Sequence, residues 1–271
     1  MPIPVFYVEG DTLPEAWENA VVKAWHEGID IRTEYDREGE LPSKDCTMMI
    51  NVKDPFAEPR IPRFFPTGMT ELAMYVLEVT EGVHDYHINP EEKKWDYTYH
   101  KRIFEYNENF NQIDAVVKKL VDTPHTRRAQ TITWMPEKDT KIDHPPCLQR
   151  LWFRAIEENG RTMLCMQSEW RSNDAFKAAF MNMYAITEIQ KIVARRVSEG
   201  LGREVSTGNY VHFSNSFHIY GKDRGDFENT FLGKFMKRPK EKRAIRSDDK
   251  SVAYEFKEAL RKLKEERAKL P

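Results

Sequence analysis

Apolar residues recur at helical spacing in four stretches of the first 200 residues. The first contains Ala16, Trp17 and Ala20, has Asp11 or Thr12 as a candidate N-cap, and ends at Gly28. The pattern predicts three further helices: Thr70 to Glu81, a short one that begins at Asn111 and stops before Pro124, and a long buried one from Asn173 to Glu199.

Shorter apolar runs bounded by turn residues predict strands. One is expected from Cys46 to Val52 and another, with alternating character, from Arg203 to His212. The runs Leu148–Ile156 and Arg161–Ser168 are separated by Glu157-Glu158-Asn159-Gly160. A polar turn that contains glycine between two such runs predicts a β-hairpin.

The last 38 residues differ in character from the rest. Residues Lys234 to Arg246 form a basic segment that contains proline, which predicts a solvated linker. A charged helix with a narrow apolar stripe follows and ends near Pro271; the stripe consists of Val252, Phe256, Leu260 and Leu263. We therefore divide the chain into residues 1–233, a catalytic domain, and 234–271, a linker and C-terminal helix.

Composition limits the class of protein. The 271 residues include 40% hydrophobic residues, enough to bury one full core. Lys plus Arg number 42 against 44 Asp plus Glu, so the charge gives no reason to expect nucleic acid or an anionic membrane as the main partner. Three cysteines without metal spacing favour free thiols in a reducing compartment and predict no bound metal. With no leader pattern or membrane-length apolar run, we expect a cytoplasmic protein.

The chemistry concentrates between Pro145 and Gly221. Two prolines precede Cys147, and a predicted strand follows it, so the thiol should be held rigidly at a turn-to-strand junction. Some twenty residues later comes Arg171-Ser172-Asn173-Asp174, then Asn182 as a polar exception in the apolar stripe of the long helix, then His218-Ile219-Tyr220.

In these motifs and their order the sequence resembles thymidylate synthase and the related pyrimidine nucleotide hydroxymethylases. The resemblance implies a single α/β (α+β) domain with a large mixed sheet covered by helices, and a homodimer joined through the sheet with shared active sites. It makes Cys147 the nucleophile, which a neighbouring Arg171 would hold as thiolate. It places Arg171 and Ser172 on the phosphate, Asn182 on the base, and His218 and Tyr220 on the sugar.

The resemblance also assigns residues outside the central stretch. Glu71 matches a glutamate that organises proton transfer at the base, and Asp174 an acidic residue that anchors the folate pterin. Trp95 and Tyr99 match the family's residues near the folate. Further phosphate ligands are Arg32 or Arg37 in a loop, and Arg127 and Arg128, which in the family reach the pocket of the other subunit. Since adjacent strand residues point to opposite faces, one of this pair should make the closer contact.

The sequence departs from the family at Leu148, where histidine is usual, and at Trp170, where glutamine is usual. Lys177 to Phe180 replaces the usual Gly-x-Pro turn, and Lys264 to Pro271 has no counterpart of the small apolar segment that closes over folate. Nucleotide binding is therefore better supported than folate chemistry.

The resemblance implies methylation of dUMP to dTMP with 5,10-methylenetetrahydrofolate as co-substrate. A first alternative is a hydroxymethylase acting on dUMP, dCMP or CMP, in which water replaces the hydride. A second is a non-catalytic protein that binds a pyrimidine nucleoside monophosphate.

Overall fold

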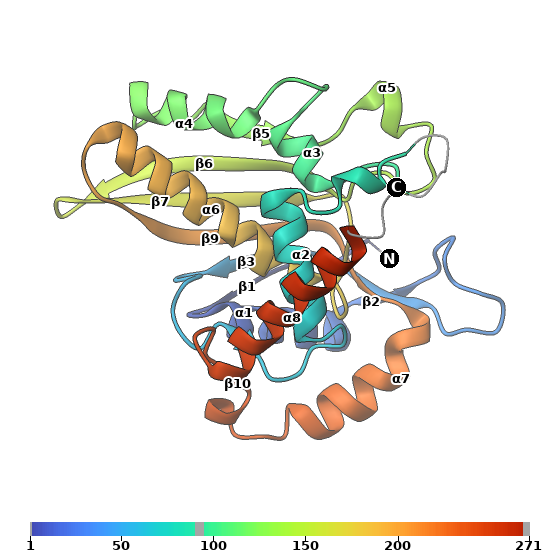
Figure 1. The fold of residues 1–271 in the computed structure, drawn as a ribbon. Helices are drawn as coiled ribbons and strands as arrows, with labels where there is room; N and C mark the ends of the chain where they lie inside the picture. Colours follow the sequence, from blue (N-terminus) through green and yellow to red (C-terminus); the bar gives the residue numbers. More distant parts are fainter. Residues whose placement is uncertain (1, 90–94, 268–271) are drawn as a thin grey trace.

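A computed structural model describes residues 2–89 and 95–267. Its centre is one mixed sheet, in the order β1-β3-β9-β7-β6-β5 (Figure 1). The main strands are β1 (Val5–Gly10), β3 (Ser43–Val52), β5 (Ala129–Ile132), β6 (Leu148–Glu158), β7 (Arg161–Trp170) and β9 (Val205–Ile219). β1 is parallel to β3 and β7 to β9, whereas the β3–β9, β6–β7 and β5–β6 pairs are antiparallel. The large mixed sheet is thus confirmed.

Two short strands pair with the ends of inner strands of the sheet. β2 (Ile29–Ile31) pairs with β3, and β8 (Asn173–Asp174) pairs with β9. A separate two-stranded ladder joins β4 (Ile61–Pro62) to β10 (Ala244–Ile245). The predicted hairpin is present: Asn159 and Gly160 between β6 and β7 both have positive φ, as a tight two-residue turn requires. β1 was not predicted.

Helices cover one face of the sheet. Those in contact with it are α1 (Leu13–Glu27), α3 (Tyr99–Phe104), α4 (Gln112–Asp122) and α6 (Ala179–Leu201). Further helices are α2 (Met69–Glu81), which packs on α6, α8 (Lys250–Arg267), which packs on α2, and α5 (Pro136–Asp139), α7 (Arg224–Asp226) and a π-helix (Phe227–Phe235). Of the two candidate caps of the first helix, Thr12 caps α1 with its side chain, and Asn111 caps α4 in the same way. The indole N–H of Trp17 donates to the Ala175 carbonyl at 2.8 Å, which ties α1 to the start of α6.

The long helix begins later than predicted. Residues Asn173 and Asp174 pair with Phe217 and His218 of β9, and Asp174 then accepts from the backbone N–H groups of Phe176 and Lys177. This side-chain cap stabilises a turn, so α6 starts only at Ala179. The same pairing places the Arg171–Asp174 motif beside the end of β9.

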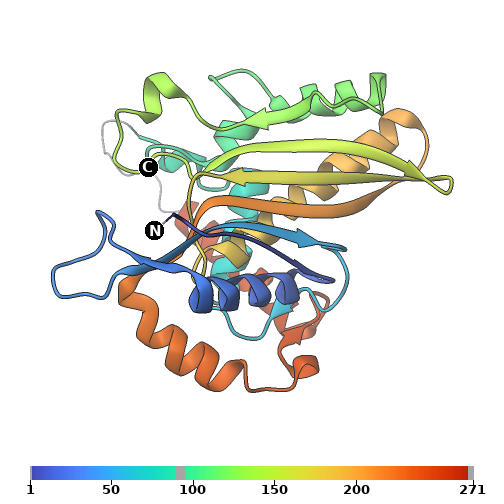
Figure 2. The same cartoon turned by 180° about the vertical axis from the view of Figure 1, so that it is seen from behind.

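The other face of the sheet has few covering elements. Figure 2 shows β6, β7 and β9 in front of α6 on this side. Along β3, Met48 and Ile50 are buried under the helices while Met49 between them is exposed. Val5 is 73% and Tyr7 54% exposed on neighbouring β1. This is the open face of the sheet, and it is the face on which a second sheet could pack.

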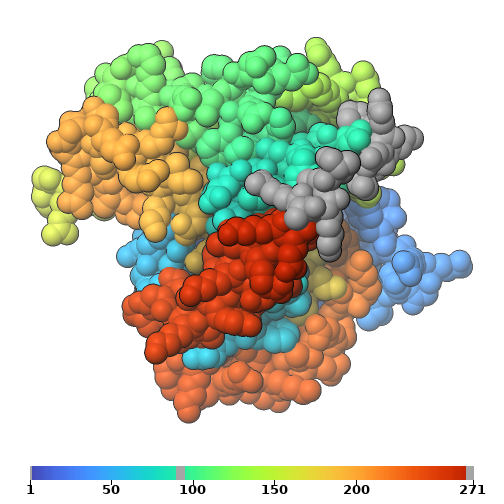
Figure 3. All heavy atoms as spheres, in the orientation of Figure 1, coloured from blue at the N-terminus to red at the C-terminus, as the bar shows by residue number. Residues whose placement is uncertain are grey.

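The C-terminal segment packs onto the domain, and the boundary at residue 233 stays a prediction. β10 pairs with β4, Arg243 forms a 2.9 Å ion pair with Glu18, and α8 lies across α2 (Figure 3). Val252 and Leu263 of the predicted stripe are buried, but Leu260 is 44% exposed because Ala259 takes the buried position beside it. Residues 268–271, where this helix was expected to end, lie outside the described residues.

Candidate active site

Cys147 lies where the prediction put it, at the junction between two prolines and β6. Its thiol is half-buried, with Sγ 3.5 Å from the Ser172 hydroxyl oxygen. The backbone N–H of Arg171 donates to the Cys147 carbonyl at 2.9 Å, and the N–H of Leu148 donates to the Tyr99 hydroxyl at 3.2 Å. These backbone contacts on both sides fix the direction of the cysteine side chain.

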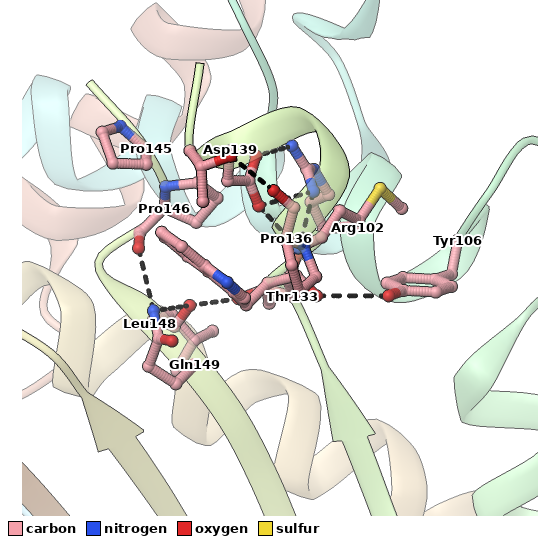
Figure 4. A network of polar contacts seen from close by, with 12 residues as sticks. Arg102, Tyr106, Thr133, Pro136, Asp139, Pro145, Pro146, Leu148 and Gln149 are labelled. Carbon is pink, nitrogen blue, oxygen red and sulfur yellow. Dashed lines mark hydrogen bonds and ion pairs between the residues drawn. The ribbon is translucent and has the colours of Figure 1, made fainter. Parts of the chain in front are cut away.

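A buried ion pair supports this loop from behind (Figure 4). Both Nη atoms of Arg102 donate to the Asp139 carboxylate, at 2.6 and 3.0 Å, and Nη1 also reaches the Thr133 carbonyl at 3.0 Å. The Thr133 hydroxyl donates to the carbonyl of Leu148, next to the cysteine. Gln149 reaches back to the Pro146 carbonyl at 3.0 Å. The contacts of Arg102, Asp139 and Thr133 are buried, so water competes little with them.

Arg171 holds the same loop and still has donors to spare. Nη2 donates to the Pro145 carbonyl at 2.7 Å, Nε to the Pro146 carbonyl at 3.1 Å, and Nη1 to the Ser172 hydroxyl at 3.3 Å. A guanidinium has five N–H groups, so about two remain for an anion. Ser172 contacts both the Arg171 guanidinium and the Cys147 thiol, so the cationic group is separated from the thiol by a single side chain. Reactive cysteines commonly lie near such a cationic group.

Two adjoining hollows meet at Cys147. They have volumes of about 410 and 420 Å³ and share Cys147, Ser172, His218 and Tyr220. The first is also lined by Asn182, Asp174, Tyr75 and Tyr99, and the second by Arg171, Tyr97 and Tyr35. This is the size range of sites for small organic ligands. We call their union the Cys147 cavity.

Asn182 presents a donor and an acceptor to this cavity. Its Oδ1 accepts from the Tyr75 hydroxyl at 2.6 Å, and its Nδ2 donates to Asn173 Oδ1 at 3.2 Å. An amide oxygen can accept twice and an amide nitrogen can donate twice, so one acceptor and one donor position stay available.

His218 has an imidazole nitrogen without a partner among the described residues. Nδ1 lies 3.2 Å from Ser216 Oγ, and Ser216 donates its hydrogen to Asp45 at 2.8 Å, whereas buried Nε2 makes no hydrogen bond. Burial lowers the pKa of His218, which keeps the ring neutral. With its proton on Nδ1, His218 offers Nε2 as a hydrogen-bond acceptor. The centroids of the His218 and Tyr220 rings are 4.6 Å apart, so the two side chains lie next to each other.

Asp174 is a carboxyl group in an unfavourable position for charge. Burial raises its pKa to about 6, although the backbone N–H groups of Lys177 and Phe176 partly oppose the effect. Both N–H groups use Oδ1, which leaves Oδ2 as an acceptor at the cavity.

Three other proposed site residues are not among those that line the Cys147 cavity. Glu71 is exposed on the first turn of α2, and Trp95 is 36% exposed with its ring 5.2 Å from that of His87. Arg32 is in an exposed loop and donates to the Glu40 carbonyl at 2.9 Å. The assignment of Glu71, Trp95 and Arg32 stays a prediction.

Arg127 and Arg128 precede β5 and do not lie on it, so the alternation of strand residues does not apply to them. Both are exposed. The strand they lead into pairs Ala129 with Phe153, five residues along β6 from Leu148, which corresponds to roughly 17 Å. Their side chains therefore cannot reach Cys147 of their own chain. The Arg127 carbonyl accepts from Trp152, on the open face of the sheet, at 3.0 Å.

The structure adds cavity residues that the sequence did not single out: Tyr75, Tyr97, Asn173 and Lys177. Tyr75 lies in an apolar helical run and is indistinguishable from a core residue there. Asn173 was visible as the variable position of the Arg171–Asp174 motif, and its polarity at a buried place was the available signal.

The expectation of no metal stays a prediction. In the described ranges, Asp85, His100 and Glu105 bring ligand atoms within 4.8 Å of one another. His100 Nδ1 is already 2.7 Å from Asp85 Oδ2, so a hydrogen bond between the two side chains accounts for that contact. No helix in the described part of the chain is long and apolar enough to span a membrane.

Comparisons with known proteins agree with this geometry. Residues 6–264 match the thymidylate synthase family model. The chain is 27% identical over 226 residues to a Methanosarcina acetivorans protein named "Putative thymidylate synthase", covering 83% of this chain and 94% of that protein. A Methanocaldococcus jannaschii protein of the same name is 27% identical over 221 residues, covering 79% and 90%. Thymidylate synthase A of Bacillus subtilis shares the fold at TM-score 0.58 and 16% identity, over 80% of this chain and 83% of that one. Because the family model spans nearly the whole chain, this protein belongs to the thymidylate synthase family of one-carbon transferases.

Proposed function

We propose that this protein methylates dUMP to dTMP through a covalent adduct of Cys147 with C6 of the base. The observation that carries the proposal is the meeting of Cys147, Arg171, Asn182 and His218 at one cavity. These side chains supply a nucleophile, a cation, a paired donor and acceptor, and a neutral acceptor. They correspond to what the ring, the phosphate, the base edge and the sugar hydroxyl of a pyrimidine nucleotide need.

The thiolate changes the reactivity of the ring. When Sγ bonds to C6, the electrons of the C5–C6 double bond move to C5 and O4, and C5 becomes a nucleophile. Asn182 supports this state because its free N–H can donate to O4 while its free lone pair accepts N3–H. After C5 has bonded to the one-carbon unit of the co-substrate, it would lose its hydrogen as a proton, and the bond between that carbon and the co-substrate nitrogen would break to leave an exocyclic methylene. A hydride from the co-substrate would then convert the methylene to a methyl group, and Sγ would leave as the C5–C6 double bond re-forms.

The co-substrate would be 5,10-methylenetetrahydrofolate, which supplies the carbon and the hydride. Oδ2 of Asp174 can accept a hydrogen bond from an N–H group of the pterin ring. Burial raises the pKa of Asp174, which favours a hydrogen bond at this carboxyl group over its exposure as a free charge. Glu71 is proposed to organise proton transfer and Trp95 and Tyr99 to border the folate.

We also propose a homodimer in which each chain completes the other's site. The open face of the sheet exposes Val5, Tyr7 and Met49, side chains suited to contact with a second sheet. Arg127 and Arg128 border that face and lie beyond reach of their own Cys147. Across a twofold axis the same pair could approach the partner's cavity and bind the phosphate bidentately. Arg32 would add a contact from its loop.

The test is to incubate the protein with methylenetetrahydrofolate and dUMP, dCMP, UMP or CMP separately and identify the products by mass. We expect dTMP from dUMP. A product heavier by a hydroxymethyl group would instead establish the hydroxymethylase. Tritium release from a 5-labelled nucleotide reports attack at C6 by itself, so its absence together with tight nucleotide binding would support the non-catalytic alternative.

A further inference from the structure

A buried chain of hydrogen bonds runs behind the wall of the cavity that carries Asn182. Its members, in order, are Trp170, Ser168, Tyr210, His212, Asn173, Asn182 and Tyr75. Trp170 Nε1 lies 2.9 Å from Ser168 Oγ, which is 2.6 Å from the Tyr210 hydroxyl. Only the last three residues line the cavity, so the others act on a ligand only through them.

His212 determines which group donates and which accepts in each of these hydrogen bonds. It is fully buried, and burial lowers its pKa to about 3, so the ring is neutral and one nitrogen donates while the other accepts. Nε2 lies 3.2 Å from Asn173 Nδ2 and Nδ1 lies 3.0 Å from the Tyr210 hydroxyl. The indole of Trp170 stacks on the His212 imidazole, with 5.4 Å between the ring centroids and 25° between the ring planes. This stacking fixes the plane of the imidazole.

The donor and acceptor roles of His212 determine those of Asn173 and, through it, those of Asn182. Asn173 donates to His212 Nε2, so it has its oxygen left for Asn182, and Asn182 must turn Nδ2 towards it. Oδ1 of Asn182 then faces the Tyr75 hydroxyl at 2.6 Å. If His212 carried its proton on Nε2 instead, both amides would have to turn over. One histidine tautomer thus corresponds to one orientation of the Asn182 amide.

The orientation of that amide decides which base it can read. Uracil offers a donor at N3 and an acceptor at position 4, whereas cytosine offers an acceptor at N3 and a donor at position 4. Turning the amide over exchanges its free donor and acceptor, which is the same exchange. We propose that His212 and Asn173 are positioning residues that lock the Asn182 amide and thereby set the choice between uracil and cytosine nucleotides. This inference rests on the proposed function, because it takes the Cys147 cavity as the nucleotide site.

The experiment offers dUMP and dCMP together to one enzyme sample and measures the ratio of their consumption. That ratio of kcat/KM values does not depend on how much of a variant is folded. We expect His212→Leu and Asn173→Leu to move the ratio towards 1 by about tenfold or more, the order expected when a polar lock on base choice is lost. His212→Gln can keep one hydrogen bond to Asn173 and should recover part of the discrimination.

Gln190→Leu is the matched control. Gln190 is equally buried and bonds the Leu164 and Gly208 carbonyls of the same sheet, but it has no link to Asn182. It should lower stability and leave the ratio unchanged. If His212→Leu and Asn173→Leu still convert dUMP with an unchanged ratio, these residues do not orient the Asn182 amide for base choice. The proposed function would remain intact. Failure of wild type to convert or bind any pyrimidine nucleotide would instead overturn the proposed function.

A spectroscopic test needs no turnover. In protein with ¹⁵N-labelled histidine, the signals that disappear in His212→Gln belong to His212. We expect a single neutral tautomer, with the proton on Nδ1 in the arrangement described, from about pH 5 to 9. Averaged nitrogen shifts would mean that both tautomers exchange, and a charged ring would mean that it donates on both sides. Either result would contradict the lock.

Discussion

The two sides of the Cys147 cavity are built in different ways. The side that faces the proposed base and sugar is complete within one chain: Asn182 and His218 are both buried, and each is held by a second layer of polar side chains. On the proposed phosphate side Arg171 lines the cavity, while Arg127 and Arg128 lie exposed at the far end of β5. One chain therefore completes the proposed base and sugar side, whereas in the proposed dimer the phosphate would also be bound by arginines of the partner subunit.

The largest effect is expected at the point where the two sides meet. Cys147→Ser should lower kcat by on the order of 10⁴-fold or more, because a hydroxyl is hardly ionised at neutral pH. The dissociation constant for dUMP should stay within a few-fold, since both sides of the cavity remain.

The control for this prediction is Cys165→Ser, which changes a half-buried thiol away from the cavity and should leave kcat intact. Substantial turnover by Cys147→Ser would rule out the covalent mechanism. Loss of binding without loss of fold would mean that the thiol holds the ground state as well.

The loop that carries Cys147, where the two sides meet, depends on the buried Arg102–Asp139 pair. Asp139→Ala should lower the free energy of unfolding by about 3–5 kcal/mol, because Arg102 would remain buried with its charge unpaired. Urea denaturation measures this loss.

A matched variant is Glu169→Ala, which removes one partner of the exposed 2.7 Å pair with Arg150. It should cost less than about 1 kcal/mol. Equal costs for the two variants would show that the Arg102–Asp139 pair is not the support that its burial indicates.

These residues also show how far the sequence could predict the site. Cys147, Arg171 and His218 stand in short motifs next to prolines or strand ends, where local patterns determine their place. The lock on Asn182 was beyond prediction, since Ser168, His212 and Asn173 belong to three strands whose register no local pattern specifies. The start of α6 was misplaced for a related reason, because the pairing of β8 with distant β9 outweighed the helical spacing. β1 was missed since its outward residues are apolar, which removes the usual alternation.

A smaller effect is expected from the carboxyl group at the floor of the cavity. Burial raises the pKa of Asp174 from 3.8 to about 6, so its protonated form is favoured in the folded protein. The stability this gives is present below about pH 4 and is lost as pH rises through 6. Asp174→Asn should therefore gain on the order of 2 kcal/mol relative to wild type between pH 4 and pH 8, measured by denaturation at each pH.

The comparison variant Asp143→Asn changes an exposed carboxylate and should track wild type at both pH values. A constant difference between Asp174→Asn and wild type would mean that this carboxyl group stays ionised throughout.

The smallest expected effect is a partial return of activity in mixed dimers, which tests the proposed phosphate side of the cavity. If Arg127 and Arg128 serve the partner's cavity, a mixed dimer of Cys147→Ser with Arg127→Ala/Arg128→Ala has one cavity with both defects and one with neither. Each homodimer alone should be nearly inactive. Random subunit exchange makes half of the dimers mixed, and each has one intact cavity of two, so activity should return to about a quarter of wild type. Native mass spectrometry verifies that mixed dimers have formed. Mixed dimers without activity would mean that the arginines serve their own chain, which the 17 Å span of β6 argues against, or that they have no part in binding the phosphate.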